Sequence, residues 1–500
     1  MPPQGPAGAQ SRSDESALSA AARFLREHRT KLLAVSAIVL IPCFWHREIE
    51  AADLGSHLYN AWLAQLIARG QVHGLWIDHR WNNVLFDCLL SGFGSLFGLR
   101  AAERIAVSLS VLIFVWGIFA LVCAVGRRAP WYLLPLIAAF AYGWTFEMGF
   151  FNYYVALGLS FFGLAIFWRG KGWERLIALA IAPLVVLAHP LGLFWLAAAC
   201  VYVGVAERVP PRYHLFLLLA ASAAIFELHQ YLWRHFVVEA HENSFYWFNG
   251  ADQLVLFGQR YRIIERAFLI FVLAAIAVDA FRRRRERRFW AAYFIPLQLY
   301  AIVGVGVALL PRGIHIPEHI GAIALLTERL TSVSAALLCC ILGALRPSRW
   351  HLAASLAIAA VFFSFLYQDT GAINRMEAEV VKLVHTLPPN QRVMGTILPA
   401  PDSRVPVQHI LDRACIGYCF SYGNYEPGTA MFRVRAMPGN PYVLSDYELA
   451  VDMEDGDYVV RSEDLPVYQV YQCTESGTDL CIHPLEADEE NDDLGVHPDQ

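Results

Sequence analysis

The sequence LIALAIAPLVVLAHPLGLFWLAAACVYVGV, residues Leu176–Val205, contains no charged side chain over 30 positions. Similar apolar runs occur at Leu215–Trp233 and Phe289–Leu310. As helices, these runs are long enough to cross a hydrocarbon layer about 30 Å thick. Charged residues make up only 17% of the chain, which is low for the surface of a soluble protein. The sequence therefore predicts an α-helical polytopic membrane protein.

The net charge of −5 is unevenly distributed along the chain. Residues 370–500 contain 22 of the 44 acidic residues but only 8 of the 39 basic ones. The remainder is basic, and its basic clusters interrupt the apolar runs, which is typical of cytoplasmic loops beside anionic lipid. A nucleic-acid partner would favour a continuous basic face, so none is expected, whereas membrane lipid is.

A basic arm, residues 1–31, precedes the first apolar run, Leu32–Trp45. Positive flanks stay in the cytoplasm, and no convincing cleavage site follows this run, so an uncleaved first helix is expected. Further basic clusters are expected on the same side of the membrane. They are Arg127–Arg128, Arg169–Arg175, Arg208–Arg212, Arg282–Arg288 and Arg346–Arg349.

All of these clusters fall on one side if the chain has about 11 spans. In this assignment Leu176–Val205 is a hairpin bent at His189-Pro190, and Asn83–Leu99 does not cross. A rival assignment, also with 11 spans, makes Asn83–Leu99 a span and Leu176–Val205 a single helix. It leaves Arg127–Arg128 and Arg169–Arg175 outside, so the hairpin is favoured. Both assignments place the C-terminal region outside the cytoplasm.

These boundaries divide the chain into four parts. They are a cytoplasmic arm (1–31), a transmembrane domain (32–368) with a long first external loop (46–81), a soluble domain (369–485) and an acidic, disordered tail (486–500). A helical pattern at 377–385 and strand-like runs at 392–398, 458–461 and 467–471 predict that the soluble part is a small α/β domain. It is expected outside the cytoplasmic (inner) membrane, in the cell envelope.

Four cysteines lie in the soluble part: Cys415, Cys419, Cys473 and Cys481. An extracytoplasmic compartment permits disulfides, and no histidine arrangement with zinc-site spacing accompanies these cysteines. Four cysteines allow three connectivities. Pairing between sequence neighbours is expected.

The first part of the first external loop, HREIEAADLGSHLYNAWLAQLIARGQ (residues 46–71), is the richest in candidate chemistry. It contains Glu48, Glu50, Asp53 and His57. If it is helical from about Ala51, Asp53 and His57 share a face, where a carboxylate can act as a base or bind a metal with the imidazole. An apolar stripe suited to the bilayer surface would consist of Leu58, Trp62, Leu66 and Ile67. The alternative is a solvated interfacial helix.

Other polar residues are expected on the same side of the membrane. Ionisable groups at membrane depth are costly and often functional. Those predicted to bind substrate are His189, Arg312, His315, Glu318 and His319. The Arg312 guanidinium could bind a phosphate through two hydrogen bonds. The alternative, equally well supported, is that its side chain only extends to the membrane interface. For His189 the alternative is a hydrogen-bonded histidine at a helix end.

One further external loop, 234–262, mixes charges and aromatic rings as a sugar-stacking surface would. Its relevant residues are His241, Glu242, Tyr246, Trp247 and Phe248. Anchoring at the membrane interface is the alternative reading.

Together these features resemble the GT-C glycosyltransferases, membrane enzymes that use polyprenyl-phosphate sugar donors. The likeness lies in the acidic residue after the first span, the long first loop, the number of spans, the late external arginine and the external C-terminal domain. It implies a sugar transfer to an extracytoplasmic acceptor, with Asp53 as base and Glu48 or Glu50 as rivals. It also implies that Arg312 contacts the donor phosphate.

The metal requirement stays open. A divalent metal is a candidate cofactor by the resemblance, but the loop lacks the Asp-any-Asp motif that such a metal would favour. Two other classes of function are alternatives: a lipid-linked saccharide flippase or other transporter, and a non-catalytic envelope scaffold. A transporter is expected to have two repeated halves and charged residues near the bilayer midplane, and neither feature is clear in this sequence.

Overall fold

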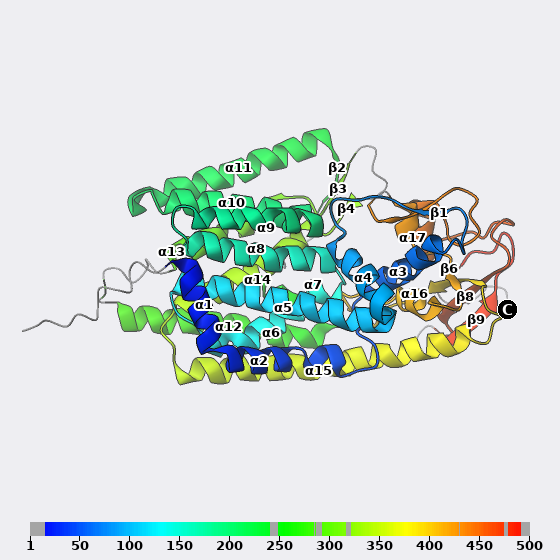
Figure 1. The fold of residues 1–500 in the computed structure, drawn as a ribbon, viewed down its shortest axis with the longest axis horizontal. Helices are drawn as coiled ribbons and strands as arrows, with labels where there is room; N and C mark the ends of the chain where they lie inside the picture. Colours follow the sequence, from blue (N-terminus) through cyan, green and yellow to red (C-terminus); the bar gives the residue numbers. More distant parts are fainter. Residues whose placement is uncertain are drawn as a thin grey trace, which may run out of the picture.

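The computed structural model describes residues 16–240, 249–284, 286, 293–316, 322–429, 431–474 and 479–491. Figure 1 shows helices lying along the long axis of the molecule, with a mixed α/β region at one end. Within the described ranges, five segments are long and apolar enough to cross a membrane. They are α5 (Leu99–Gly126), α8 (Phe151–Arg169), η3 with α11 (Pro211–His235), α14 (Leu326–Ala344) and α15 (Arg349–Val384).

Further helices complete the bundle. They are α1 (Ala17–Glu27), α2 (Arg29–Val39), α4 (Leu85–Phe97), α6 (Leu134–Ala141), α7 (Trp144–Glu147), α9 (Glu174–Ala188), α10 (Pro190–Ala206), α12 (Arg262–Arg283) and α13 (Phe294–Leu309). Helix α4, whose 13 residues rise about 20 Å, is not among the five candidate spans.

The 30-residue apolar run folds as the predicted hairpin. His189 is extended, with φ −164° and ψ 131°, and its Nδ1 accepts the Leu191 amide at 3.2 Å as the N-cap of α10. Pro190 occupies the first turn of α10, where its missing N–H is tolerated, and it disfavours helical backbone at the residue before it. The single-helix alternative for Leu176–Val205 is therefore wrong.

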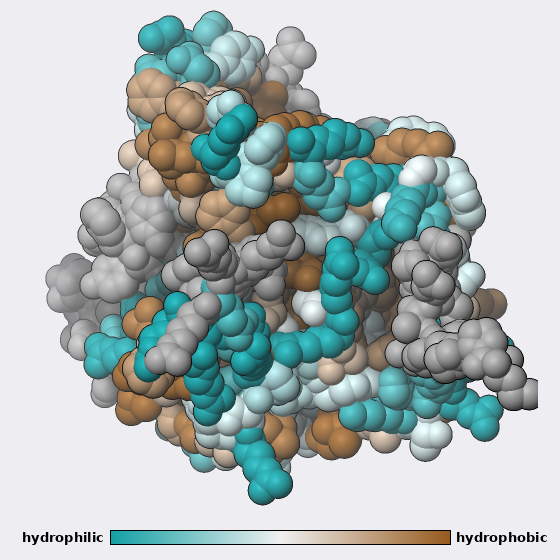
Figure 2. Space-filling view, turned by 90° about the vertical axis from the view of Figure 1, so that its left-hand side faces the viewer, coloured by the Kyte–Doolittle hydropathy of each residue, from teal (hydrophilic) through white to brown (hydrophobic). Residues whose placement is uncertain are grey.

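Basic loops meet at the end of the bundle opposite the α/β region. Arg128, after α5, donates to the Gly343 carbonyl near the end of α14 at 2.9 and 3.0 Å. Arg346, before α15, pairs with Glu286 after α12 at 2.7 Å. Figure 2 looks onto this end and shows hydrophilic side chains over much of it. The loops that carry the basic clusters are thus neighbours in space.

The bundle is built around α5 and α8, which approach closely because both have a glycine at the contact. A Cβ atom at Gly117 would overlap the Gly158 carbonyl. Nearby, the Phe114 and Tyr154 rings stack with centroids 4.1 Å apart. By contrast, α11 leaves large apolar side chains such as Phe216 uncovered by protein, as expected of a helix that faces lipid.

The C-terminal region is joined to the bundle by the 36-residue helix α15, which runs along the lower edge of Figure 1. Its four-stranded sheet has the order β6-β5-β8-β9, with β5 parallel to β6 and β8 and with β9 antiparallel to β8. The strands are β5 (Arg392–Thr396), β6 (Phe420–Ser421), β8 (Val467–Gln472) and β9 (Leu480–Pro484), flanked by α16 (Ile410–Cys415) and α17 (Tyr447–Asp455). Disulfides join Cys415 to Cys419 and Cys473 to Cys481.

Two predictions for this region are wrong. Residues 458–461 form no ladder; only an isolated bridge links Val459 to Glu490. The beginning of the acidic tail is ordered, because the Asn491 side chain is buried and donates to the Met453 carbonyl at 2.7 Å. It also accepts the Tyr458 amide at 2.8 Å. Residues 492–500 lie outside the described part of the chain.

Helix α3 (Leu54–Ala68) lies between the bundle and the C-terminal region. Leu58 belongs to the bundle core, whereas Trp62, Leu66 and Ile67 pack against the core around the C-terminal sheet. After α3, β1 (Leu75–Ile77) pairs with β7 (Val434–Ala436). The predicted bilayer-facing stripe is therefore buried at Leu58 and half-buried at its other three residues, since the C-terminal region supplies an apolar partner that the local pattern does not reveal.

Candidate active site

Asp53 lies at the N-terminus of α3, where the chain turns between the bundle and the C-terminal region. Its amide donates to the Met148 carbonyl at 3.3 Å, and the preceding amide donates to the Glu147 carbonyl at 2.7 Å. Gly149 has φ +78°, and a Cβ atom there would lie 2.6 Å from the Asp53 nitrogen. Only glycine therefore allows the corner between α7 and α8 to hold Asp53 this closely.

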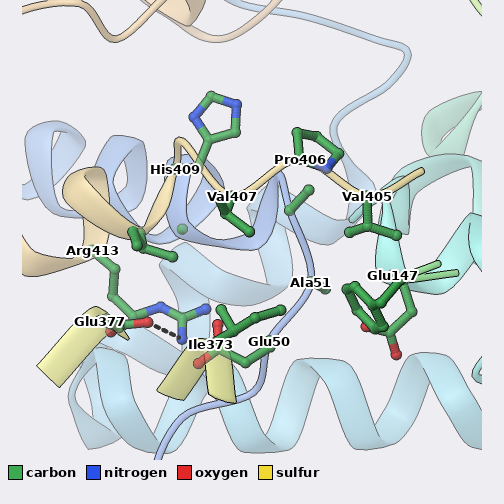
Figure 3. Close-up of a pocket in the computed structure, with 14 residues that line it drawn as sticks. Glu50, Ala51, Glu147, Ile373, Glu377, Val405, Pro406, Val407, His409 and Arg413 are labelled. Atoms are coloured by element: carbon green, nitrogen blue, oxygen red, sulfur yellow. Dashed lines mark hydrogen bonds and ion pairs between the residues drawn. The ribbon is translucent and has the colours of Figure 1, made fainter. Parts of the chain in front are cut away.

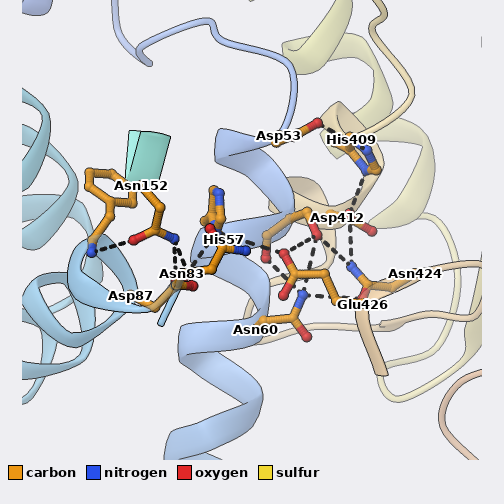
Figure 4. Close-up of polar contacts among 12 residues, drawn as sticks. Asp53, His57, Asn60, Asn83, Asp87, Asn152, His409, Asp412, Asn424 and Glu426 are labelled. Atoms are coloured by element: carbon orange, nitrogen blue, oxygen red, sulfur yellow. Dashed lines mark hydrogen bonds and ion pairs between the residues drawn. The ribbon is translucent and has the colours of Figure 1, made fainter. Parts of the chain in front are cut away.

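The same turn touches the C-terminal region on its other side. A Cβ atom at Gly55 would overlap the carbonyl oxygen of His409, the residue that precedes α16. The His409 Nε2 atom lies 3.8 Å from Asp53 Oδ1, and its Nδ1 lies 2.9 Å from Asp412 Oδ2. Figure 4 shows His409 between these two carboxylates. The Asp53 side chain remains 19% exposed.

A second histidine-carboxylate pair comes from α3 and α4. His57 Nδ1 lies 2.8 Å from Asp87 Oδ1, and the other Asp87 oxygen accepts from the Asn152 side chain at 2.8 Å. Asn152 also accepts the Phe86 amide at 2.8 Å, which ties α8 to the start of α4. The Glu426 carboxylate lies 3.8 Å from the same His57 nitrogen. His57 is thus oriented by carboxylates on two sides.

Amide and hydroxyl groups connect the two pairs across the junction. Asn424 donates to Asp412 at 3.0 Å and to the Ser56 hydroxyl at 3.1 Å. Ser56 donates to Glu426 at 3.0 Å, and Asn60 donates to the Asn424 carbonyl oxygen at 3.1 Å. Figure 4 shows this network passing directly from α3 to the C-terminal region. Because its groups are largely buried, it fixes one relative position of the two parts.

The electrostatics favour charged imidazoles around Asp53. Burial raises the pKa of Asp53, while the charges of His409, His57 and Arg329 act against this rise. Burial alone would lower the pKa of His57, but Asp87, Glu426 and Asp53 raise it to about 9. Burial likewise opposes protonation of His409, yet Asp412, Glu454 and Asp53 raise its pKa to about 10.

Two acidic residues at the junction titrate near neutrality. Burial raises the pKa of Glu426 to about 7, against the charge of His57, and it raises the pKa of Glu454 to about 7, against the charge of His409. Carboxylates with such pKa values are typical of functional sites, where a base must work near neutral pH.

Arg329, in the first turns of α14, is the arginine whose charge acts on Asp53. Its guanidinium lies 4.2 Å from the centre of the Phe150 ring. The predicted phosphate ligand, Arg312, instead bonds Glu328 at 3.0 Å and is 51% exposed. Arg329, adjacent in sequence to the partner of Arg312, is thus close enough to act electrostatically on the candidate base.

Glu50 belongs to a different cluster. It accepts from Asn374 at 2.6 Å, and burial together with the nearby Glu377 carboxylate raises its pKa. Arg413 lies 3.3 Å from Glu377 and 3.5 Å from Glu103. Figure 3 shows Arg413 beside Glu50 and Glu377, with the His409 ring turned away from them. These residues line a small cavity of about 20 Å³, room for about one water.

The remaining predicted substrate ligands are dispersed. His189 caps α10 and contacts the Tyr153 ring edge-to-face, with centroids 5.4 Å apart. His315 lies on β3 (Gly313–His315), which pairs with β2 (Val237–Glu239) and β4 (Ala322–Ile323), and it lies 3.3 Å from Glu239. Glu318 and His319 lie outside the described residues, as do the predicted sugar-stacking residues His241, Glu242, Tyr246, Trp247 and Phe248.

Several residues of the site carry no local signal in the sequence. Asp87, His409, Asp412 and Glu426 stand in unremarkable contexts, and Arg329 lies within an apolar helix. Within the described part of the chain, no group of three or more His, Cys, Asp or Glu side chains is arranged to hold a metal ion. No protein-family model, curated protein or solved structure matches this chain. The function must therefore be argued from the site.

Proposed function

We propose that this protein is a membrane glycosyltransferase of the GT-C type, which moves a sugar from a polyprenyl-phosphate donor to an extracytoplasmic acceptor. The observation that carries the proposal is the setting of Asp53. It is a partly exposed carboxylate held by backbone on both sides, with cationic side chains around it. Such a carboxylate can accept a proton from an acceptor hydroxyl while the nearby cations balance negative charge.

The proposed membrane arrangement has 11 crossings, made by α2, α5, α6 and α8 to α15. It is supported by the hairpin at His189 and by the gathering of the basic loops at one end of the bundle. The C-terminal region and the candidate site would then lie outside the cytoplasmic membrane. Two disulfides in that region agree with an oxidising compartment.

In the proposed reaction, the acceptor oxygen attacks the anomeric carbon of the donor sugar as its proton moves to Asp53. The bond between that carbon and the phosphate oxygen breaks, and its electron pair leaves with the polyprenyl phosphate. Arg329 would stabilise the charge that develops on the phosphate, since a guanidinium offers charge-assisted hydrogen bonds to phosphate oxygens. Arg312, engaged by Glu328, would guide the lipid phosphate from the surface.

Aromatic rings next to the site support a sugar ligand. The Tyr425 ring lies 5.4 Å from the His409 ring, and its neighbours Phe432 and Tyr447 have centroids 5.6 and 6.3 Å from it. Aromatic residues present a large, rigid apolar face, and tyrosine adds a hydroxyl for hydrogen bonding.

The test is transfer by the full-length protein in lipid nanodiscs. Polyprenyl-phosphate mannose and polyprenyl-phosphate glucose, each with a radiolabelled sugar, are the donor probes, and an isolated cell-envelope fraction supplies acceptors. Asp53→Asn keeps the side-chain shape but removes its basicity, so transfer should fall by about 10²- to 10⁴-fold. Glu48→Gln and the matched control Glu50→Gln should cost less, because Glu50 is engaged by Asn374. Parental transfer by folded Asp53→Asn would refute the role of Asp53.

A further inference from the structure

The base of the proposed reaction belongs to the bundle side of the junction, but one of its charged neighbours belongs to the C-terminal region. We infer that His409, held by Asp412, is a positioning residue that keeps Asp53 ionised, so that the C-terminal region completes the active site. The inference rests on the proposed function and deepens it. It assigns a role in the chemistry to a region that is remote in sequence from every predicted catalytic residue.

Backbone packing holds His409 at this place. The carbonyl oxygen of His409 occupies the space that a side chain at residue 55 would need, so Gly55 allows the two segments to touch. Only 5% of the His409 side chain is exposed, and its ring contacts Tyr425. A histidine packed on both sides cannot swing away from Asp53 without separating the two segments.

Asp412 determines which nitrogen faces Asp53. One Asp412 oxygen accepts from Asn424 at 3.0 Å and faces His409 Nδ1, and the other accepts from the Ser421 hydroxyl. With Asp412 fixed in this way, Nδ1 donates to it and Nε2 points toward Asp53. His57 has a comparable carboxylate partner, Asp87, 2.8 Å from its Nδ1 atom.

The surrounding charges keep the imidazole protonated. His409 faces Asp412 from α16, Glu454 from α17, Asp53 before α3, and the Tyr425 hydroxyl. Three carboxylates therefore lie around one imidazole ring. A positive charge on this ring costs little at neutral pH, and it offsets the burial that would otherwise protonate Asp53.

Ionisation of Asp53 matters because a protonated carboxyl cannot accept the hydroxyl proton. The cations that act on Asp53 are His409, His57 and Arg329, and the acidic groups that act on it include Asp412, Glu426, Glu454 and the Tyr425 hydroxyl. An opposite charge within about 4–6 Å typically lowers a carboxyl pKa by about 1–3 units. Loss of the His409 charge should therefore move the acid limb of the pH profile of kcat/KM upward by about one unit or more.

The first experiment measures that pH profile for the full-length protein with the radiolabelled donor probes. His409→Gln should lose at least tenfold more transfer at the acid end of the profile than at the alkaline end. His409→Asn provides a second neutral variant and should move the acid limb in the same direction, with Asp412 left intact because its own charge also acts on Asp53. His483→Gln is the matched control, because His483 pairs with Glu489 at 3.5 Å in the same region but away from the site.

The second experiment needs no substrate. The His409 imidazole is titrated by NMR in protein labelled at histidine, and its signal is assigned as the one missing from His409→Gln. Removal of the Asp53 charge by Asp53→Asn should lower the His409 pKa by about one unit or more. The same titration in a Glu489→Gln variant should leave the His409 signal unchanged.

The outcomes separate this inference from the proposed function. A lowered His409 pKa in Asp53→Asn together with a raised acid limb in either folded variant supports the inference. An unchanged His409 titration, or variants whose transfer falls equally at every pH, overturns it. Coupling between His409 and Asp53 in a parental protein that transfers neither sugar would instead overturn the proposed function, and with it the catalytic meaning of the pair.

Discussion

Arg413 should be the residue on which docking of the C-terminal region depends most. It projects from α16 among Glu50, Glu103 and Glu377, and it donates to the Ile49 carbonyl at 2.8 Å. Arg413→Met keeps much of the side-chain volume but removes the positive charge. The carboxylates would then remain buried without their cation.

The expected loss follows from that geometry. Removal of one partner from a buried ion pair typically costs about 3–5 kcal/mol, because the other charge stays buried. The lost bond to the Ile49 carbonyl contributes about 1 kcal/mol of this. Protonation of the carboxylates relieves the charge, so the loss should depend on pH.

The sign of the pH dependence is set by Glu50, whose pKa is raised in the folded protein. A group whose pKa is raised by folding stabilises the fold most at pH values below its pKa in the unfolded chain, which is near 4.5. This contribution is lost as the pH rises through the pKa of the group in the folded protein. Without Arg413 the pKa of Glu50 rises further, so the penalty grows with pH. It should approach about 1 kcal/mol near pH 5 and reach about 3–5 kcal/mol near pH 8.

The assay is thermal unfolding of the purified protein in detergent, followed by tryptophan fluorescence at both pH values. Arg461→Met is the matched control, since Arg461 forms an exposed pair with Glu463 at 3.8 Å and should cost less than about 1 kcal/mol at either pH. Glu377→Gln combined with Arg413→Met should recover part of the loss. An equal loss at both pH values, or none, would refute the buried-charge argument.

Two further predictions concern the junction and the donor. Gly55→Ala should destabilise docking, because its Cβ atom would overlap the His409 carbonyl, and amide hydrogen exchange in α16 should become faster. The control is Gly92→Ala, which should be neutral or slightly stabilising because nothing lies within 4 Å of its Cβ position. Arg329→Gln should reduce kcat/KM for the donor probes by at least about tenfold, whereas Arg312→Gln should cost less because Arg312 is half exposed. A larger effect of Arg312→Gln would exchange the two assigned roles.

Much of the fold could be predicted from local sequence patterns. Long apolar runs specify helices that bury or expose nonpolar faces, and a histidine followed by proline in the middle of such a run specifies a hairpin. The first loop was correctly predicted to contain a helix, although the helix begins at Leu54, after Asp53, and not near Ala51. The prediction was wrong about the surroundings of this helix, because Leu66 and Ile67 pack against the C-terminal region and not against lipid, and Glu50 accepts a hydrogen bond from Asn374.

Arg329, whose charge acts on Asp53, shows more clearly what local sequence patterns cannot predict. Arg312 lies in a loop that the sequence predicts to be external, where an arginine is a candidate ligand. Arg329 lies inside a largely apolar helix, where a structural role is the ordinary expectation. Its relation to Asp53 depends on how the start of α14 is placed against the corner between α7 and α8. Neither hydropathy nor spacing contains that information.

By itself the sequence determined the helical class, the hairpin within the longest apolar run and the polar character of the segment after the first helix. These are local properties, since periodicity and turn residues act over a few positions. Only the tertiary structure decided that His409, with its partner Asp412, lies beside Asp53, and that His57 is paired with Asp87. Contacts between segments so far apart arise from packing of the whole chain, which brings together residues whose local sequences are unrelated.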